Sequence, residues 1–190
     1  MLNTRRLTFI AILGALSFVL MFFSFPIIPG ADFLKVELSV LPVLLGLFLM
    51  DVKAAYQILI LRTVLKLLLN NHGVNDVIGL PMNIVALGLF VTCFAVFTHR
   101  RQSTKSLLLA GGIGTLSLTV AMLFLNYVYA MPLYATFANF DIAKHIGTST
   151  YLVGMVLPFN LVQGALFTLA TVIILLPHKR LFRRIMDDAQ

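Results

Sequence analysis

The sequence predicts an all-α integral membrane protein, with six transmembrane helices in a single domain over residues 1–190. Hydrophobic residues make up 60% of the chain and charged residues only 11%, against about 25% charged residues in soluble domains. The mean hydropathy is +1.00, and several apolar stretches approach the about 20 residues that a bilayer-spanning helix needs. This composition excludes an ordinary soluble enzyme.

The spans are expected, in order, at Leu7–Ile28, Val36–Met50, Ala54–Leu69, Val77–Thr98, Ser106–Met131 and Tyr151–Leu176. The first and the last three are long enough to cross a bilayer alone. The second and third have only about 15 and 16 residues and extend about 23 Å. The polar connection Asp51–Lys53 separates these two, so we interpret them as a helical hairpin. The connections Pro26–Lys35 and Pro132–Thr150 are expected to be long external loops.

The first span follows Arg5 and Arg6, as the apolar segment of a signal peptide would, but it has no small-x-small cleavage site. We therefore expect an uncleaved helix. Ala11 and Ala15 lie one turn apart on it, and small residues at this spacing allow another helix to approach closely in lipid. The same spacing also arises by chance in apolar helices, so Ala11 and Ala15 are candidates for binding a partner.

The distribution of Lys and Arg predicts the orientation, because cytoplasmic connections retain most basic residues. With the N-terminus inside, ten of the 14 basic residues are cytoplasmic, namely Arg5, Arg6, Lys53, Arg100, Arg101, Lys105, Lys179, Arg180, Arg183 and Arg184. Both termini are therefore predicted to be cytoplasmic. The net charge of +7 then lies at helix ends, and the basic segment His178–Arg184 is expected to meet anionic lipid rather than nucleic acid.

Polar side chains inside the spans gather in the predicted outer half. Asn83 opens the fourth span, Asn126 closes the fifth, and Asn160 and Gln163 share one face of the sixth. Side-chain amides both donate and accept hydrogen bonds, which suits a neutral ligand with hydroxyl and carbonyl groups. Amides that hold helices together are the alternative interpretation.

Aromatic and charged residues occur in the same outer region. Tyr127 and its aromatic neighbours provide surface for a flat ring, although tyrosines at this depth also form interfacial belts. Arg62 and Lys66 lie four residues apart on the third span, and we expect them to form structural ion pairs with Glu37, Asp32 or Asp76.

Several kinds of site are missing from the sequence. There is no phosphate-binding loop, dinucleotide-binding glycine pattern or hydrolase motif. The single cysteine, Cys93, cannot form an intrachain disulfide, and no metal-ligand spacing occurs. We therefore expect no catalytic residue, no metal and no cofactor, and an energy source supplied by a partner.

Four segments resemble the riboflavin-specific substrate-binding component of energy-coupling factor (ECF) transporters. They are Phe33–Pro42, Gly79–Asn83, Asn126–Tyr134 and Pro158–Gly164. The resemblance covers nearly the whole chain. It implies a multi-pass protein of the cell membrane that captures riboflavin from outside and associates with a transmembrane coupling protein and two ATP-binding-cassette ATPases.

The resemblance also implies which residues bind. The ligand contacts carried over fall near Glu37 and Leu38 and on Asn126, Asn160 and Gln163, and the alanine strip that contacts the coupling protein corresponds to Ala11 and Ala15. Many relatives have Lys in place of Gln163 and Asp in place of Glu37, which leaves the preference between riboflavin and a phosphorylated flavin open. The alternative functions are binding of another vitamin, such as thiamine, and an integral-membrane enzyme acting on a lipid.

Overall fold

The computed structural model describes residues 4–28, 34–99 and 103–187, with side chains described as far as Leu175. Its helices are α1 (Thr4–Leu20), α2 (Val40–Leu49), α3 (Val52–Leu69), α4 (Val74–Thr98), α5 (Thr104–Leu125), α6 (Met131–Phe137), α7 (Ile142–His145) and α8 (Leu157–Asp187). The π-helical segment η1 (Asn126–Ala130) joins α5 to α6, and a second one, η2 (Thr150–Val156), leads into α8.

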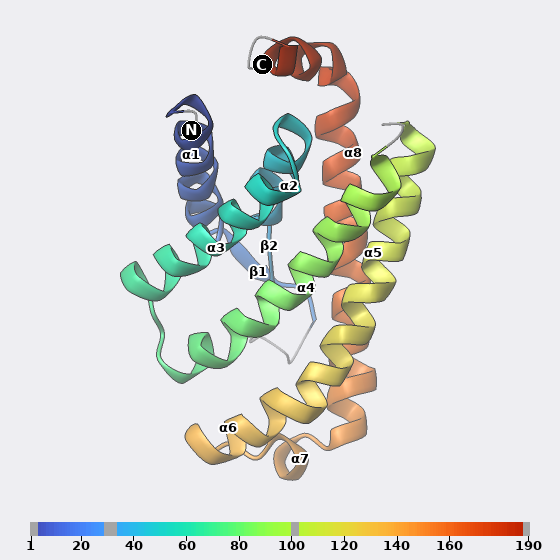
Figure 1. Ribbon diagram of the computed structural model, residues 1–190. Helices are drawn as coiled ribbons and strands as arrows, with labels where there is room; N and C mark the ends of the chain where they lie inside the picture. The colour runs from blue at the N-terminus through green and yellow to red at the C-terminus, as the bar shows by residue number, and fades with distance from the viewer. Residues whose placement is uncertain (1–3, 29–33, 100–102, 188–190) are drawn as a thin grey trace.

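The long helices α4, α5 and α8 run along the length of the molecule, with α5 packed against both of the others (Figure 1). Helices α1, α2 and α3 pack against one another, and contacts of α3 with α4 and of α2 with α8 join the two groups. The short helices α6 and α7 lie at one end, while the start of α1 and the end of α8 lie at the other (Figure 1). This placement of the two chain ends is consistent with an even number of membrane crossings.

Three helical runs in the described residues are long and apolar enough to cross a membrane, namely Val74–Thr98, Thr104–Phe137 and Thr150–Leu175. The shorter helix α2 is also apolar. The prediction of a helical protein with membrane-spanning segments is therefore confirmed in this coarser form. Six spans and two cytoplasmic termini stay predictions, and the basic side chains of His178–Arg184 lie outside the described residues.

The prediction was wrong between the first two helices. Helix α1 ends at Leu20 rather than Ile28, and α2 begins at Val40 rather than Val36. Strands β1 (Ser24–Pro26) and β2 (Lys35–Glu37) form an antiparallel ribbon here. Proline lacks an N–H and disfavours helical geometry in the residue before it, which is in keeping with the extended backbone of Ser24–Pro26.

The fifth span was also misjudged, because the helix continues beyond Met131 to Phe137. A proline in a regular helix clashes with the preceding turn. Before Pro132, however, the chain widens into η1, where the N–H of Met131 bonds to the carbonyl of Asn126. The wider turn accommodates Pro132, so the expected loop at residues 132–150 instead contains α6 and α7.

Helices α5 and α8 approach each other closely through glycine. A Cβ atom at Gly111 would collide with Thr168, and one at Gly164 would collide with Thr115. Both threonine hydroxyls bond to carbonyls of their own helices, Thr115 to Gly111 and Thr168 to Gly164. This tight contact fixes the relative positions of the two helices, whose continuations through η1 and η2 carry the polar residues described below.

Helices α2 and α3 form the predicted hairpin, but Met50 and Asp51 connect them, because Val52 and Lys53 already belong to α3. Asp51 caps the start of α3. Its carboxylate accepts a 2.8 Å bond from the backbone N–H of Ala54 at the start of α3. It also accepts two bonds from the Arg6 guanidinium, of 2.7 and 2.8 Å. The hydrogen bonds from Arg6 lower the pKa of the Asp51 carboxyl below its ordinary value, with a further contribution from the backbone N–H of Ala54.

Replacing Asp51 with asparagine is expected to destabilise the protein by a few degrees at pH 7 and by less at pH 3. Because the carboxyl pKa is lower in the folded state than in the unfolded one, the pair stabilises the fold above the unfolded pKa of about 4 and loses this effect as the pH falls through the folded pKa. Both side chains are partly exposed, at 33% and 43%, so the contribution is at most about 1 kcal/mol. Thermal unfolding of the detergent-purified proteins measures it, and a difference that grows on acidification would contradict the assignment.

Candidate binding site

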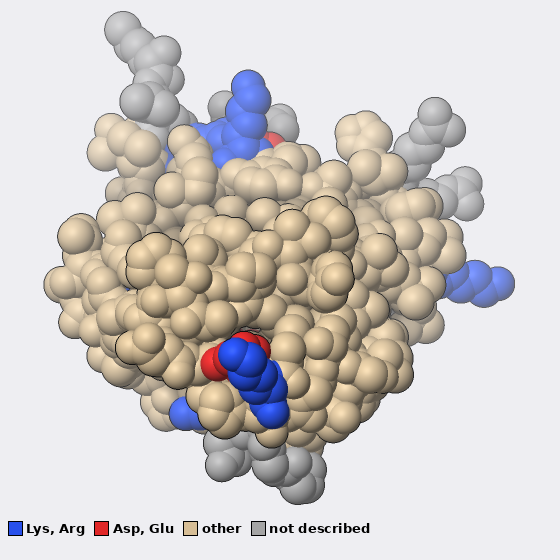
Figure 2. Space-filling view, turned by 90° about the horizontal axis from the view of Figure 1, so that it is seen from below, with Lys and Arg blue, Asp and Glu red and all other residues tan. Residues whose placement is uncertain are grey.

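A cavity of about 330 Å³ opens near the end of the molecule that carries α6 and α7. That end has a mostly uncharged surface, with a small group of acidic and basic side chains near its middle (Figure 2). The volume of the cavity lies within the range of about 300–1,000 Å³ that is typical of small-molecule sites. The lining residues are Leu34, Lys35, Asn75, Ile78, Gly79, Met82, Asn83, Ala86, Leu87, Leu118, Met122, Asn126, Ala130, Tyr134, Ala138, Phe140, Ile142, Tyr151, Phe159, Asn160 and Gln163.

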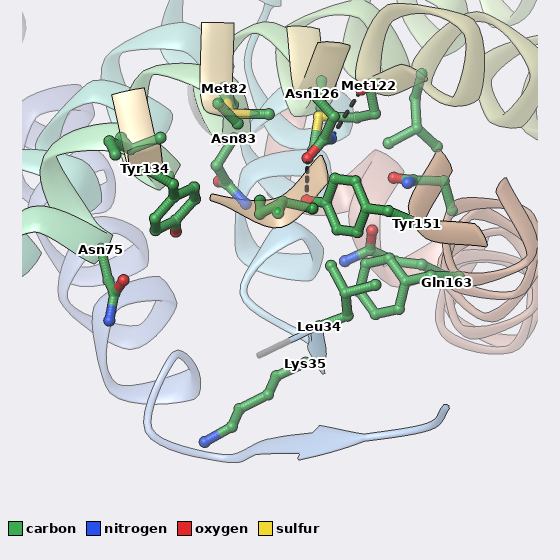
Figure 3. Close-up of a pocket in the computed structure, with 18 of the residues that line it drawn as sticks. Leu34, Lys35, Asn75, Met82, Asn83, Met122, Asn126, Tyr134, Tyr151 and Gln163 are labelled. Atoms are coloured by element: carbon green, nitrogen blue, oxygen red, sulfur yellow. Dashed lines mark hydrogen bonds between the residues drawn. The ribbon is translucent and has the colours of Figure 1, made fainter. Parts of the chain in front are cut away.

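The structure brings together the four amide side chains that the sequence grouped, Asn83, Asn126, Asn160 and Gln163. They come from α4, η1 and α8 and surround one cavity, with Asn75 as a further amide in the lining (Figure 3). Asn83 does not open its helix as expected, because α4 begins nine residues earlier, at Val74.

Asn126 is held by two hydrogen bonds whose direction is fixed. Its amide nitrogen donates to the carbonyl of Met122 at 2.8 Å, and its oxygen accepts from the Tyr151 hydroxyl at 2.6 Å (Figure 3). Both side chains are buried. The bond joins the two π-helical segments η1 and η2, and π-helical turns inside longer helices often occur at functional sites. Tyr151 was missed as a site residue, since the sequence showed it only as the first residue of a span.

Asn160 presents a hydrogen-bond acceptor that the described residues leave unused. Its amide nitrogen donates to the carbonyl of Val156 at 2.7 Å, whereas its buried Oδ1 atom has no partner among them. A buried polar atom without a partner is costly, so it is normally paired in the working state of the protein. Gln163 lies about one turn further along the same helix and also lines the cavity.

Three residues expected at the site lie outside the cavity lining. Tyr127 is 59% exposed, because it follows the inward-facing Asn126 and so points to a different side of the helix. Glu37 and Leu38 are half-buried but do not line the cavity, whereas Leu34 and Lys35 do. Lys35 begins strand β2 and Leu34 directly precedes it, and this strand was not predicted from the sequence. Phe33 of the first resembling segment lies outside the described residues.

The expected ion pairs are present. Arg62 contacts Glu37 at 3.1 Å and Lys66 contacts Asp76 at 3.4 Å, whereas Asp32 lies outside the described residues. Arg62 is buried completely and also donates to Ser39 and to Asn83. The guanidinium therefore connects the ion pair to an amide of the cavity. No group of three or more His, Cys, Asp or Glu side chains that could hold a metal ion occurs in the described residues.

Ala11 and Ala15 lie on the exposed side of α1, away from the cavity. The neighbouring Gly14 is buried, and a Cβ atom there would come within 2.5 Å of Leu61 in α3. The glycine therefore belongs to the internal packing of the protein, while the two alanines form a strip of small side chains on its surface.

Comparison with known proteins identifies relatives along the whole chain. The family described as "ECF transporter, substrate-specific component" matches residues 5–175. A riboflavin transporter RibU of Streptococcus thermophilus is 56% identical over 179 residues, covering 94% of this chain and 85% of the relative. Another RibU, from Leuconostoc mesenteroides, is 42% identical over 186 residues, covering 96% and 95%. The solved structure described as "Structure and mechanism of the S component of a bacterial ECF transporter" is similar with a TM-score of 0.74, at 26% identity and 98% coverage of both chains.

Proposed function

The chain belongs to the substrate-specific components of ECF transporters, and from this membership we propose that it captures riboflavin in the cavity lined by α4, η1 and α8. It is a transporter component and not an enzyme. The observation that carries the proposal is the set of amide side chains around a cavity of about 330 Å³. The names of the two RibU relatives support riboflavin as the ligand.

The lining matches the chemistry of riboflavin. Its flat ring system needs apolar and aromatic surface, which Leu87, Tyr134 and Phe159 supply. Its carbonyls, imide N–H and ribityl hydroxyls need partners that both accept and donate, as amides do. Lys35 is the one charged side chain among the described lining residues. A phosphorylated flavin would favour clustered arginines, so we propose a preference for riboflavin itself.

The wider assignment follows from the same membership. We propose a multi-pass protein of the cell membrane with six spans and cytoplasmic termini, which binds riboflavin from outside. It then associates with a transmembrane coupling protein, which packs on the strip of Ala11 and Ala15, and with two ATP-binding-cassette ATPases. Riboflavin is the cargo of this process, and no resident cofactor is proposed.

The detergent-purified protein is expected to quench the fluorescence of added riboflavin in a saturable titration, and to be yellow when ligand copurifies. Burial of the flavin between side chains brings about the quenching. Thiamine in large excess is the control and should leave the titration unchanged. A colourless protein that leaves riboflavin fluorescence unchanged would exclude riboflavin as the ligand, and displacement by thiamine would favour the other vitamin.

A further inference from the structure

Arg62 stands at the centre of a polar cluster that joins five elements. The cluster contains Ser17 of α1, Glu37 of β2, Ser39 at the start of α2, Arg62 of α3 and Asn83 of α4. One terminal nitrogen of Arg62, Nη1, donates to Glu37 and Ser39, and the other, Nη2, donates to Asn83. Ser39 in turn donates to Glu37 at 2.8 Å and accepts at its carbonyl from Ser17 at 2.5 Å.

Neutralising the charge of Arg62 requires only its contact with Glu37. A buried guanidinium is costly unless it is paired, and Glu37 already supplies the opposite charge at 3.1 Å. The bond of Nη2 to Asn83 is additional, and it extends from the ion pair to a residue of the cavity lining. Figure 3 shows Asn83 extending from α4 into the middle of the pocket view.

The chemistry of the guanidinium fixes the orientation of the Asn83 amide. Arginine only donates hydrogen bonds, so the atom of Asn83 that faces it has to be the carbonyl oxygen. The amide nitrogen then lies on the other branch of the side chain, where it can donate into the cavity. Without Arg62 the amide could turn over and present either end, because its two ends have nearly the same shape.

We propose that Arg62 is a positioning residue, which holds Asn83 as a hydrogen-bond donor toward an acceptor of the ligand, such as a flavin carbonyl. The inference rests on the proposed function. Asn160 offers an acceptor instead of a donor, since its Oδ1 atom has no partner among the described residues. The cavity therefore recognises a ligand that accepts at Asn83 and donates at Asn160. Lysine cannot replace Arg62, because one ammonium group lacks the planar fork that contacts Glu37 and Asn83 together.

A double-mutant cycle on riboflavin affinity tests this role. The variants are Arg62→Lys, which keeps the charge facing Glu37, Asn83→Ala, which removes the donor, and the double variant. We expect each single substitution to weaken riboflavin binding by about fivefold or more. The double variant should bind as weakly as Asn83→Ala alone, because Arg62 acts through Asn83. Losses that multiply in the double variant would show that Arg62 acts independently and would overturn the proposal.

The variant Asn83→Asp gives a second measurement, which does not depend on replacing a buried arginine. A carboxylate still accepts from Arg62 but has no N–H to donate, so thermal stability should stay close to that of the unmodified protein while riboflavin binding weakens. Riboflavin affinity equal to that of the unmodified protein would overturn the proposal. If the unmodified protein does not bind riboflavin, the proposed function fails and this inference with it. If the unmodified protein binds riboflavin but the losses of affinity multiply in the double variant, only the proposed role of Arg62 fails.

Discussion

Replacing Asn160 with leucine is expected to weaken riboflavin binding by about five- to 150-fold, while the protein still folds. The substitution removes the buried Oδ1 atom, the acceptor without a partner among the described residues, at a position that lines the cavity. A hydrogen bond lost in a desolvated site costs about 1–3 kcal/mol, which corresponds to this range of affinities. Leucine is well tolerated inside a membrane helix. Fluorescence titration measures the affinity, and thermal unfolding without ligand measures the fold.

Two further variants on the same helix separate ligand contact from helix packing. Gln163→Leu lies on the cavity side and should weaken binding in the same range. Val162→Leu is the matched control, because Val162 is 47% exposed on the outer side of the helix, and its affinity should not change. Unchanged affinity in both Asn160→Leu and Gln163→Leu would mean that these amides connect helices and that the ligand binds elsewhere.

The amides of the site could be predicted from the sequence because polar groups are rare inside apolar helices. Asn160 and Gln163 stand out within a span, and their spacing of three residues places them on one face. Tyr151 could not be recognised in this way, because a tyrosine at a helix end is common at a membrane interface. The bond from Arg62 to Asn83 depends on the packing of α3 against α4, which no local pattern encodes.

The fold was predictable where apolar runs are long, and not where two proline residues occur. At Pro26 the chain leaves the helix and forms the ribbon of β1 and β2, while before Pro132 it widens into η1 and remains helical. Different tertiary contacts accompany the two outcomes. The strand residue Val36 is buried in the core, and Asn126 of η1 bonds to Tyr151 of η2.

The exposed strip on α1 leads to a second set of expectations, because it is separate from the cavity. Ala11 and Ala15 are exposed, whereas the cavity lining begins at Leu34 and contains no residue of α1 among those described. Small side chains let another helix approach closely in lipid. If the coupling protein packs on this strip, capture of riboflavin and its transport should be separable by mutation.

The variant Ala15→Trp is expected to abolish most ATP-dependent riboflavin uptake and copurification with the coupling module, while riboflavin binding by the isolated protein stays nearly normal. The indole prevents the close approach of a partner helix but projects from the exposed face of α1. Val120→Trp on α5, at a position that is 66% exposed, places the same side chain elsewhere in the lipid-facing surface and should leave uptake intact. Full uptake by an Ala11→Trp, Ala15→Trp double variant would exclude the strip as a tight docking surface. Joint loss of binding and uptake would instead indicate that the indole disturbs the folding of the protein, and the strip would lose its support as a docking surface.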